Sequence, residues 1–279
     1  MKQRKTFKLI FTAFSTMLLT CCILFFTGCK NNDDVVDDSA KKYFAKDNKV
    51  VVFEQSGVDK LTGVDIPIGL PIILFRNFIS LNNNVYSYGF NNAETNETLF
   101  ITKLLLSSNK ILSDLDLNFN ISETDFNFIT PNIPILDESV ASQKLCLDTL
   151  INYKVDASTF ISTISPGVKI NIDVNLKITL INNGSKTFKL NDTTLNVVSY
   201  TTKTEFNATI NDPLVQQFMA SYNNKLIATG TYENENYFSI NYLGIVFQSK
   251  ALYIKNTLLN IDVVNNLFTC KLISDIILE

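Results

Sequence analysis

The side chains that we consider for acid–base chemistry in this chain are paired carboxylates, since the sequence contains no histidine. The absence of histidine removes Ser-His-Asp and Cys-His catalysis, histidine-ligated zinc, and the usual general base near neutral pH. The chain also lacks a phosphate-binding loop, a dinucleotide-binding glycine motif and a G-x-S-x-G sequence. A pair of carboxylates could still hydrolyse a glycosidic bond. The candidates for such a pair, which the sequence does not rank, are Glu123, Asp125, Asp137, Glu138, Asp148 and Asp156.

Two short motifs match functional sites only in part. The run Asp114-x-Asp116-x-Asn118 resembles the start of a calcium loop, but Phe119 stands where the loop needs glycine and Asp125 where it needs glutamate. A half-buried strand with alternating polar and apolar residues explains this spacing better. Ser107-x-x-Lys110 has the spacing of an S-x-x-K motif without its companion sequences. We therefore expect no metal, no cofactor and no catalytic serine.

The first thirty residues have the layout of a secretory signal. A positive segment containing Lys2, Arg4, Lys5 and Lys8 precedes the uncharged run from Leu9 to Phe26, and small residues then lead to Cys29. The sequence Thr27-Gly28-Cys29 resembles the lipobox of bacterial lipoproteins. That resemblance implies cleavage before Cys29, lipidation of its thiol, and a bacterial membrane as partner, with the outer membrane or cell surface favoured. An uncut signal anchor and ordinary cleaved secretion are the alternatives.

The cysteines and the net charge of the chain after the signal restrict its possible disulfides and its possible partners. Cys146 and Cys270 remain after Cys21, Cys22 and Cys29, and they could form one disulfide or be two buried free thiols. Removing residues 1–28 takes four of the 24 basic residues and none of the 27 acidic ones, which leaves a net charge of −7. That balance argues against nucleic acid as a partner. Residues 1–28 are thus expected to be a signal peptide, 29–44 a lipidated flexible tether, and 45–279 a β-rich region, with a subdivision near 131–166 as an option.

The mature sequence predicts a mainly antiparallel β fold, either a β-sandwich or a half-open barrel, with one short helix packed on it. Apolar residues occupy every second position from Ile170 to Leu180, which indicates a long strand with one buried face. A three-residue loop of Asn182, Asn183 and Gly184 would pair Ile178 with Phe188, whereas a two-residue turn would place Phe188 on the polar face. The pattern favours the three-residue loop and predicts a positive φ at Gly184.

Asparagine pairs and prolines set the other expected boundaries. Strands over 226–233 and 237–247 would be joined by a turn at 234–236, and strands over 252–264 and 267–278 by a turn at 265–266. Asp212 and Pro213 open the expected helix. The apolar run from Ile66 to Phe78 contains two prolines, which exclude a central strand. It could be an exposed apolar loop, or an edge segment that closes the core, which we favour.

These features predict a membrane-anchored extracytoplasmic lipoprotein with a non-catalytic binding or structural role at the cell envelope. The first alternative is a carrier of an apolar small molecule or lipid in a β cup, which requires an open cavity of several hundred cubic ångströms. The second is a carboxylate-dependent hydrolase, which requires two acids facing one cleft. Cys29 is the one residue to which the sequence assigns a chemical role, namely lipid attachment.

Overall fold

The described part of the chain is a single antiparallel sheet. The computed structural model describes residues 38–43, 50–61, 64–121, 124–156, 171–210, 213, 226–240, 244–257 and 260–276, and Asp38–Glu279 forms one compact unit. A 3₁₀ turn, η1 (Asp38–Tyr43), precedes thirteen strands: β1 (Val50–Leu61), β2 (Val64–Pro67), β3 (Ile72–Asn82), β4 (Val85–Asn92), β5 (Thr98–Ser107), β6 (Lys110–Ile121), β7 (Thr124–Asp137), β8 (Leu145–Asp156), β9 (Asn171–Leu190), β10 (Thr193–Ile210), β11 (Leu226–Ser239), β12 (Gly244–Asn256) and β13 (Ile261–Ile276).

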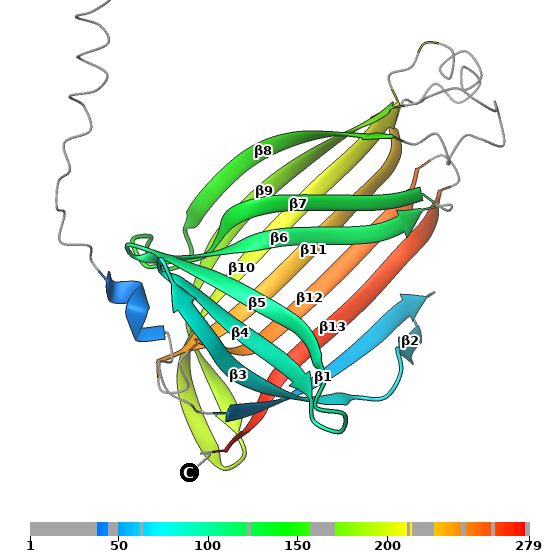
Figure 1. Ribbon diagram of the computed structural model, residues 1–279. Coiled ribbons are helices and arrows are strands. Elements are labelled where there is room, and N and C mark those ends of the chain that lie inside the picture. The colour runs from blue at the N-terminus through cyan, green and yellow to red at the C-terminus, as the bar shows by residue number, and fades with distance from the viewer. Residues whose placement is uncertain are drawn as a thin grey trace, which may run out of the picture. The chain divides into compact units, whose positions relative to one another are not determined.

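The sheet curls into a nearly closed barrel, which confirms the antiparallel β prediction and its barrel alternative. Its strands follow the order β7-β6-β5-β4-β3-β1-β13-β12-β11-β10-β9-β8, and β2 pairs with β1 beside this path (Figure 1). The two end strands, β7 and β8, are linked through Tyr153, whose hydroxyl donates to the Ile129 carbonyl at 3.1 Å and lies 2.8 Å from Thr130 Oγ1. The predicted subdivision near 131–166 covers the second half of β7 and the whole of β8, and both strands belong to this one sheet.

The long hairpin of β9 and β10 turns later than predicted. It reverses at Asn191–Asp192, so Ile178 pairs with Thr204 rather than with the predicted Phe188, and Leu176 pairs with Phe206. Gly184 has the predicted positive φ of 80°, but it lies inside β9, at a bulge between the pairs Gly184–Ser199 and Asn182–Tyr200. The predicted loop is therefore wrong. The later turn is preferred because it aligns two long runs of buried apolar residues across the hairpin.

Two other asparagine-rich segments predicted as turns lie inside strands. Asn234, Glu235 and Asn236 occupy the middle of β11, and Asn265 and Asn266 lie within β13. Their backbone groups belong to regular antiparallel ladders with the neighbouring strands. Both turn predictions are wrong. The expected helix from Asp212 lies outside the described residues except for Pro213, which is helical.

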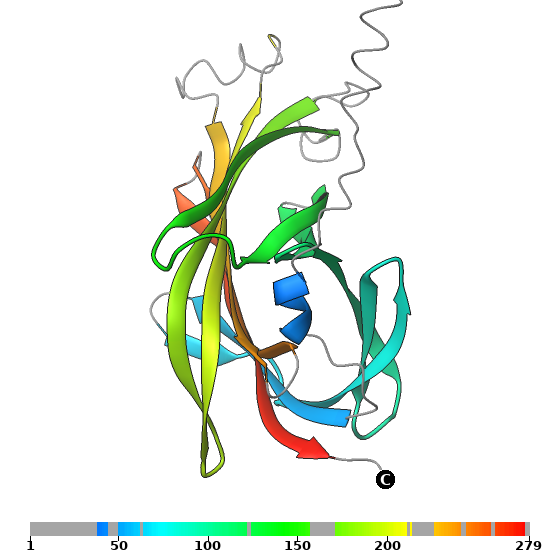
Figure 2. The ribbon, with the colours of Figure 1, turned by 90° about the vertical axis from the view of Figure 1, so that its left-hand side faces the viewer.

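The segment before β1 and the proline-rich run also differ from expectation. Ala40 and Tyr43 of η1 are 0% and 2% exposed and pack among core residues from β4, β5 and β11. The packed domain therefore begins within the stretch assigned to the tether, and Figure 2 shows η1 between opposing parts of the sheet. In the run from Ile66 to Phe78, β2 is the predicted edge element, but its side chains are exposed, as is Leu70 at 86%. β2 does not close the core. The second half of the run belongs to β3, which pairs with both β1 and β4, and its Leu74 is 0% exposed in the core. The exclusion of a central strand is therefore wrong for this part of the run, because Pro71 precedes β3 and takes no place in its ladder.

Candidate functional site

The barrel encloses a cavity of about 640 Å³, and its mouth lies where β5 and β6 separate. Only three residue pairs, from Leu105–Leu112 to Ser107–Lys110, join these two strands. Beyond them, β5 continues to pair with β4 and β6 with β7, so the two strands diverge (Figure 1). Residues from both diverging segments line the cavity, which places the opening between them.

One wall of the cavity is largely apolar. Its side chains come from β4, β5, β6 and β7, and they include Phe90, Phe100, Leu104, Leu115, Ile133 and Ile135. The rings of Phe90 and Phe100 stack with their centroids 4.6 Å apart. Phe100 and Ile129 are also 39% and 56% exposed, so the apolar wall extends to the mouth. Such a surface suits an apolar ligand that enters from solvent.

The wall formed by β10, β11 and β12 carries a row of polar side chains. Thr202 pairs directly with Asn234, and Asn234 pairs directly with Lys250. Cross-strand partners share a face of the sheet, with Cβ atoms about 4.5–5.5 Å apart. All three residues line the cavity. We call Thr202, Asn234 and Lys250 the inner polar row.

The inner polar row is not satisfied by its own protein neighbours. Thr202 is 2% exposed, yet Thr202 Oγ1 and Asn234 Oδ1 have no hydrogen-bond partner within the described part of the chain. Lys250 forms no ion pair with any described residue. Burial lowers the pKa of Lys250, and this effect exceeds the opposing influence of Cys270 and Asp116. A polar group buried without a partner is destabilising, so these atoms can gain from a bound molecule or water.

A second cation, Arg76 from β3, lies in the same cavity. Its guanidinium donates to the Ile245 carbonyl at 3.1 Å and lies over the rings of Phe53 and Tyr88, at 5.2 and 5.4 Å from their centroids. Burial lowers the pKa of Arg76 to about 10, so it stays charged at neutral pH. Of the described residues that line the cavity, two are acids, Asp114 and Asp116, and both are exposed. The cavity thus has a positive interior and acids in contact with solvent.

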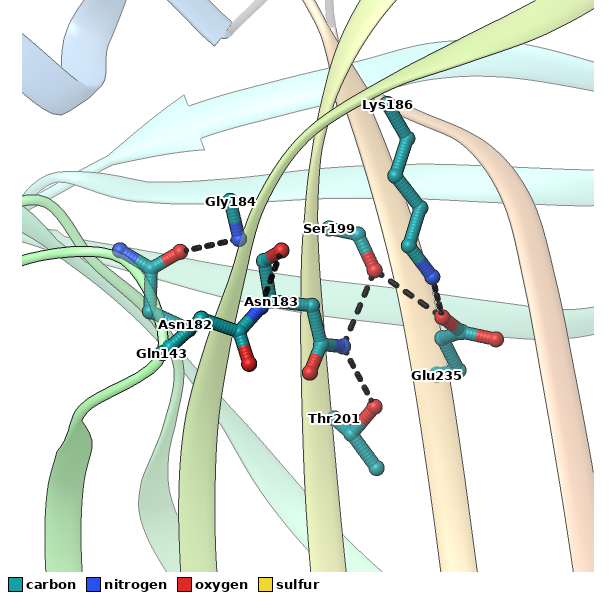
Figure 3. Close-up of polar contacts among 8 residues, drawn as sticks. All are labelled: Gln143, Asn182, Asn183, Gly184, Lys186, Ser199, Thr201 and Glu235. Atoms are coloured by element: carbon teal, nitrogen blue, oxygen red, sulfur yellow. Dashed lines mark hydrogen bonds and ion pairs between the residues drawn. The ribbon is translucent and has the colours of Figure 1, made fainter.

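A second polar cluster lies on the other face of β10 and β11 (Figure 3). The Asn183 amide donates to Ser199 Oγ at 3.1 Å and to Thr201 Oγ1 at 2.8 Å. Glu235 accepts from Ser199 Oγ at 3.0 Å and from Lys186 Nζ at 2.7 Å. We call these five residues the outer network. It borders a surface hollow of about 350 Å³, but its polar side chains already bind one another.

The residues singled out from the sequence do not form this site. Cys29 lies outside the described residues. Cys146 in β8 and Cys270 in β13 are free thiols, so the structure has no disulfide between them. Cys270 lines the cavity, and burial raises its pKa to about 11, which keeps it a protonated thiol rather than a nucleophilic thiolate.

The candidate carboxylates are engaged elsewhere or lie outside the description. Asp137, Glu138 and Asp148 form ion pairs with Lys110, Lys42 and Lys177, and none of the three lines the cavity. Glu123 and the side chains of Asp125 and Asp156 are outside the described part. Within that part no group of three or more potential metal ligands occurs. Leu115 and Leu117 are buried and Asp114 and Asp116 exposed, which confirms the alternation predicted for β6.

The inner polar row was missed because its members resemble ordinary surface residues of a strand. The alternation of residues along β10 does, however, distinguish the threonines from surface residues. Thr202 and Thr204 fall between Tyr200 and Phe206, at alternate positions that are otherwise buried. Polar residues in phase with core positions indicate a polar patch on the inner face.

No helix among the described residues is long and apolar enough to cross a membrane.

Comparison with known proteins yields only weak structural similarity. No protein-family model matches the chain, and no curated protein matches it in sequence. The chain is similar to a candidate lipoprotein from Parabacteroides distasonis ATCC 8503, at 11% identity and a TM-score of 0.36, over 84% of this chain and 98% of that one. It is also similar to a candidate exported protein with a YmcC-like fold from Bacteroides fragilis NCTC 9343, at 10% identity and a TM-score of 0.29, with the same coverages. At these TM-scores the similarity assigns no function.

Proposed function

We propose that this protein is a lipid-anchored extracytoplasmic binding protein that holds an apolar or amphipathic small molecule inside its β barrel and catalyses no reaction. The observation that carries the proposal is the cavity of about 640 Å³ with one apolar wall. Pockets for small molecules typically measure about 300–1,000 Å³ and are mostly apolar with a few polar groups. The cavity has this size, and its apolar wall on β4 to β7 faces polar groups on β10 to β12. The anchor rests on the sequence of residues 1–29.

A non-catalytic role fits the chemistry of the cavity. The thiol of Cys270 is protonated, and Lys250 forms no ion pair with a carboxylate among the described residues. Among the described residues, the acids that line the cavity and could serve the hydrolase alternative are Asp114 and Asp116. Asp114 Oδ1 already accepts a hydrogen bond from the Asn132 backbone at 3.0 Å.

The anchor is tested by the intact mass of the chain after extraction from the membrane of an expressing bacterium. A mature chain that begins at Cys29 and carries acyl groups is expected. A chain that retains Met1, or one that begins elsewhere with a free amino terminus, would remove the anchor from the proposal. Cys29→Ala, which leaves the signal charges and apolar run intact, is the matched control and should abolish the lipid mass.

The cavity is tested with a long-chain alcohol that carries a photoreactive diazirine, applied to the full chain in liposomes. Cross-links are expected on peptides of β4 to β7 that line the cavity. Thr102→Trp places a large ring in the cavity and should remove these cross-links. Leu150→Trp, at a site 67% exposed, should preserve them. Cross-links confined to the outer surface, or cross-links in the cavity that are unchanged in Thr102→Trp, would contradict a carrier function.

A further inference from the structure

We infer that the inner polar row binds the anionic head of a single-chain amphiphile whose tail lies against the apolar wall. This inference rests on the proposed function, because it names the class of molecule that the cavity takes. It assigns a role to Thr202, Asn234 and Lys250, for which the fold alone gives no reason. Charge, hydrogen bonds and the division of the cavity walls each support this assignment.

Lys250 supplies the charge. An ammonium group buried without a partner is costly, and burial of a cation is tolerated when an anion and hydrogen bonds compensate it. Lys250 lines the cavity and has no ion pair within the described part of the chain. Asp116 is close enough to affect its titration, but it is exposed and does not form an ion pair with Lys250. A ligand anion would supply the missing partner directly.

Thr202 and Asn234 supply hydrogen bonds at the same place. The Thr202 hydroxyl is buried, lines the cavity and has no partner among the described residues, so it can donate to a carboxylate or phosphate oxygen. Asn234 Oδ1, also without a described partner, can accept from a hydroxyl or a protonated oxygen of the head. Because the three residues are successive cross-strand partners, one small head group can reach all of them.

The division of the walls selects an amphiphile rather than a free anion. The inner polar row lies on β10 to β12, and the Phe90–Phe100 stack and the leucine and isoleucine side chains lie on β4 to β7. A wholly polar anion would leave the apolar wall in water, and a wholly apolar molecule would leave Lys250 and Thr202 without partners. Arg76 adds a second positive charge inside the cavity and so favours the same sign of ligand.

The inference is tested by competition against the neutral diazirine alcohol, using the full chain in liposomes of neutral phosphatidylcholine. Competitors of equal chain length carry a carboxylate, a phosphate, a hydroxyl or an ammonium head. In the wild type, the carboxylate or phosphate should displace the probe at a concentration about tenfold lower than the hydroxyl compound, which corresponds to about 1.4 kcal/mol. The anion that displaces the probe better identifies the head.

Three variants locate the effect. Lys250→Gln should remove the preference for anions while the alcohol still binds, and Lys255→Gln, on the same strand with the opposite phase, should keep it. Asp116→Asn should strengthen displacement by the anions, because it removes a nearby negative charge. Thr202→Val should weaken it by about threefold and serves as the second test if Lys250→Gln misfolds. Circular dichroism reports folding of each variant.

Different failures have different meanings. Equal displacement by the carboxylate, phosphate and hydroxyl compounds in the wild type would overturn the anionic head and leave cavity binding standing. Strongest displacement by the ammonium compound would overturn it as well, and would place the head at Asp116. An unchanged anion preference in folded Lys250→Gln would overturn the role of the inner polar row. Absence of any cavity labelling by the probe would overturn the proposed function itself.

Discussion

The two polar clusters of β10 and β11 are built from similar residues in neighbouring positions, yet their interactions differ. Thr201 and Glu235 belong to the outer network, and Thr202 and Asn234, one position away on each strand, belong to the inner polar row. In the outer network Lys186 forms an ion pair with Glu235, and Thr201 accepts a hydrogen bond from Asn183. In the inner polar row the threonine and asparagine have unpaired oxygens in the described structure, and the lysine has no ion pair.

The pKa values of Lys186 in the outer network and Lys250 in the inner polar row shift in opposite directions. Burial acts to lower the pKa of Lys186, but its hydrogen bond and ion pair with Glu235 outweigh burial, so its pKa is raised. Burial lowers the pKa of Lys250, which has no such partner. A cluster that satisfies itself contributes to stability, whereas a cluster that lacks partners is available to a ligand. Mutations on the two faces should therefore change stability in opposite directions.

The largest effect is expected from Glu235→Ala, which breaks the outer network at its centre. Glu235 accepts hydrogen bonds from Ser199 and Lys186, and Ser199 is 0% exposed, so its hydroxyl would lose a charged partner. The free energy of unfolding should fall by about 2 kcal/mol, the usual scale for hydrogen bonds to charged groups. Urea denaturation followed by circular dichroism measures it. Glu233→Ala, an exposed residue of the same strand and phase, should change it by less than about 0.5 kcal/mol.

The opposite sign is expected for Lys250→Met, which removes a cation from the inner polar row. The folded-state pKa of Lys250 lies below its unfolded value of 10.5, while Asp116 and Cys270 oppose that shift. The folded protein thus binds this proton more weakly, and the penalty is full below the folded pKa and disappears as the pH rises to about 10.5. The variant should be more stable by about 1–2 kcal/mol at pH 7, and this gain should shrink at higher pH. A loss of stability at pH 7 would show that Lys250 has a partner.

Sequence reasoning recovered the antiparallel sheet and its alternating strands, but it read asparagine as a turn signal. About one residue in eight is asparagine, so its presence carries little information about turns. In the structure Asn183 joins the outer network, Asn234 the inner polar row, and Asn265 donates to the Lys60 carbonyl at 2.9 Å. These side chains have roles within strands. Only pairing over the full length of β9 and β10 distinguishes the bulge at Gly184 from a hairpin loop.

The cavity could not be predicted because it depends on long-range closure of the sheet. The residues that surround it come from strands as far apart in sequence as β1 and β13, and no local pattern shows that their polar and apolar faces meet. Lys250 is the clearest example. Its strand places Gln248, Lys250, Leu252 and Ile254 in the same phase, and only the last two are apolar, while the opposite phase carries Phe247, Ala251 and Tyr253. Sequence alone gives no reason to assign that phase to the interior.

An intermediate effect is expected from Gly184→Ala at the bulge that presents Asn183. Gly184 has a φ of +80°, and an added Cβ would clash with Ser142 Oγ. The Ser142 side chain can rotate away, but the left-handed backbone remains unfavourable for alanine, so the loss should be about 1 kcal/mol. Gly184→Asn, which tolerates that backbone better, is the matched comparison. Equal loss for both would point to steric conflict rather than backbone conformation as the cause.

The smallest and most direct test compares Thr201→Val with Thr202→Val, since the same change is made at adjacent positions that face opposite sides of the sheet. Thr201 Oγ1 accepts from the Asn183 amide at 2.8 Å, and its loss should lower the free energy of unfolding by about 1 kcal/mol. Thr202 Oγ1 has no partner in the described structure, so removing it should be neutral or stabilising by up to about 1 kcal/mol. If Thr202→Val instead costs as much as Thr201→Val, an ordered water or another protein group already satisfies the hydroxyl, and the contrast between the two faces disappears.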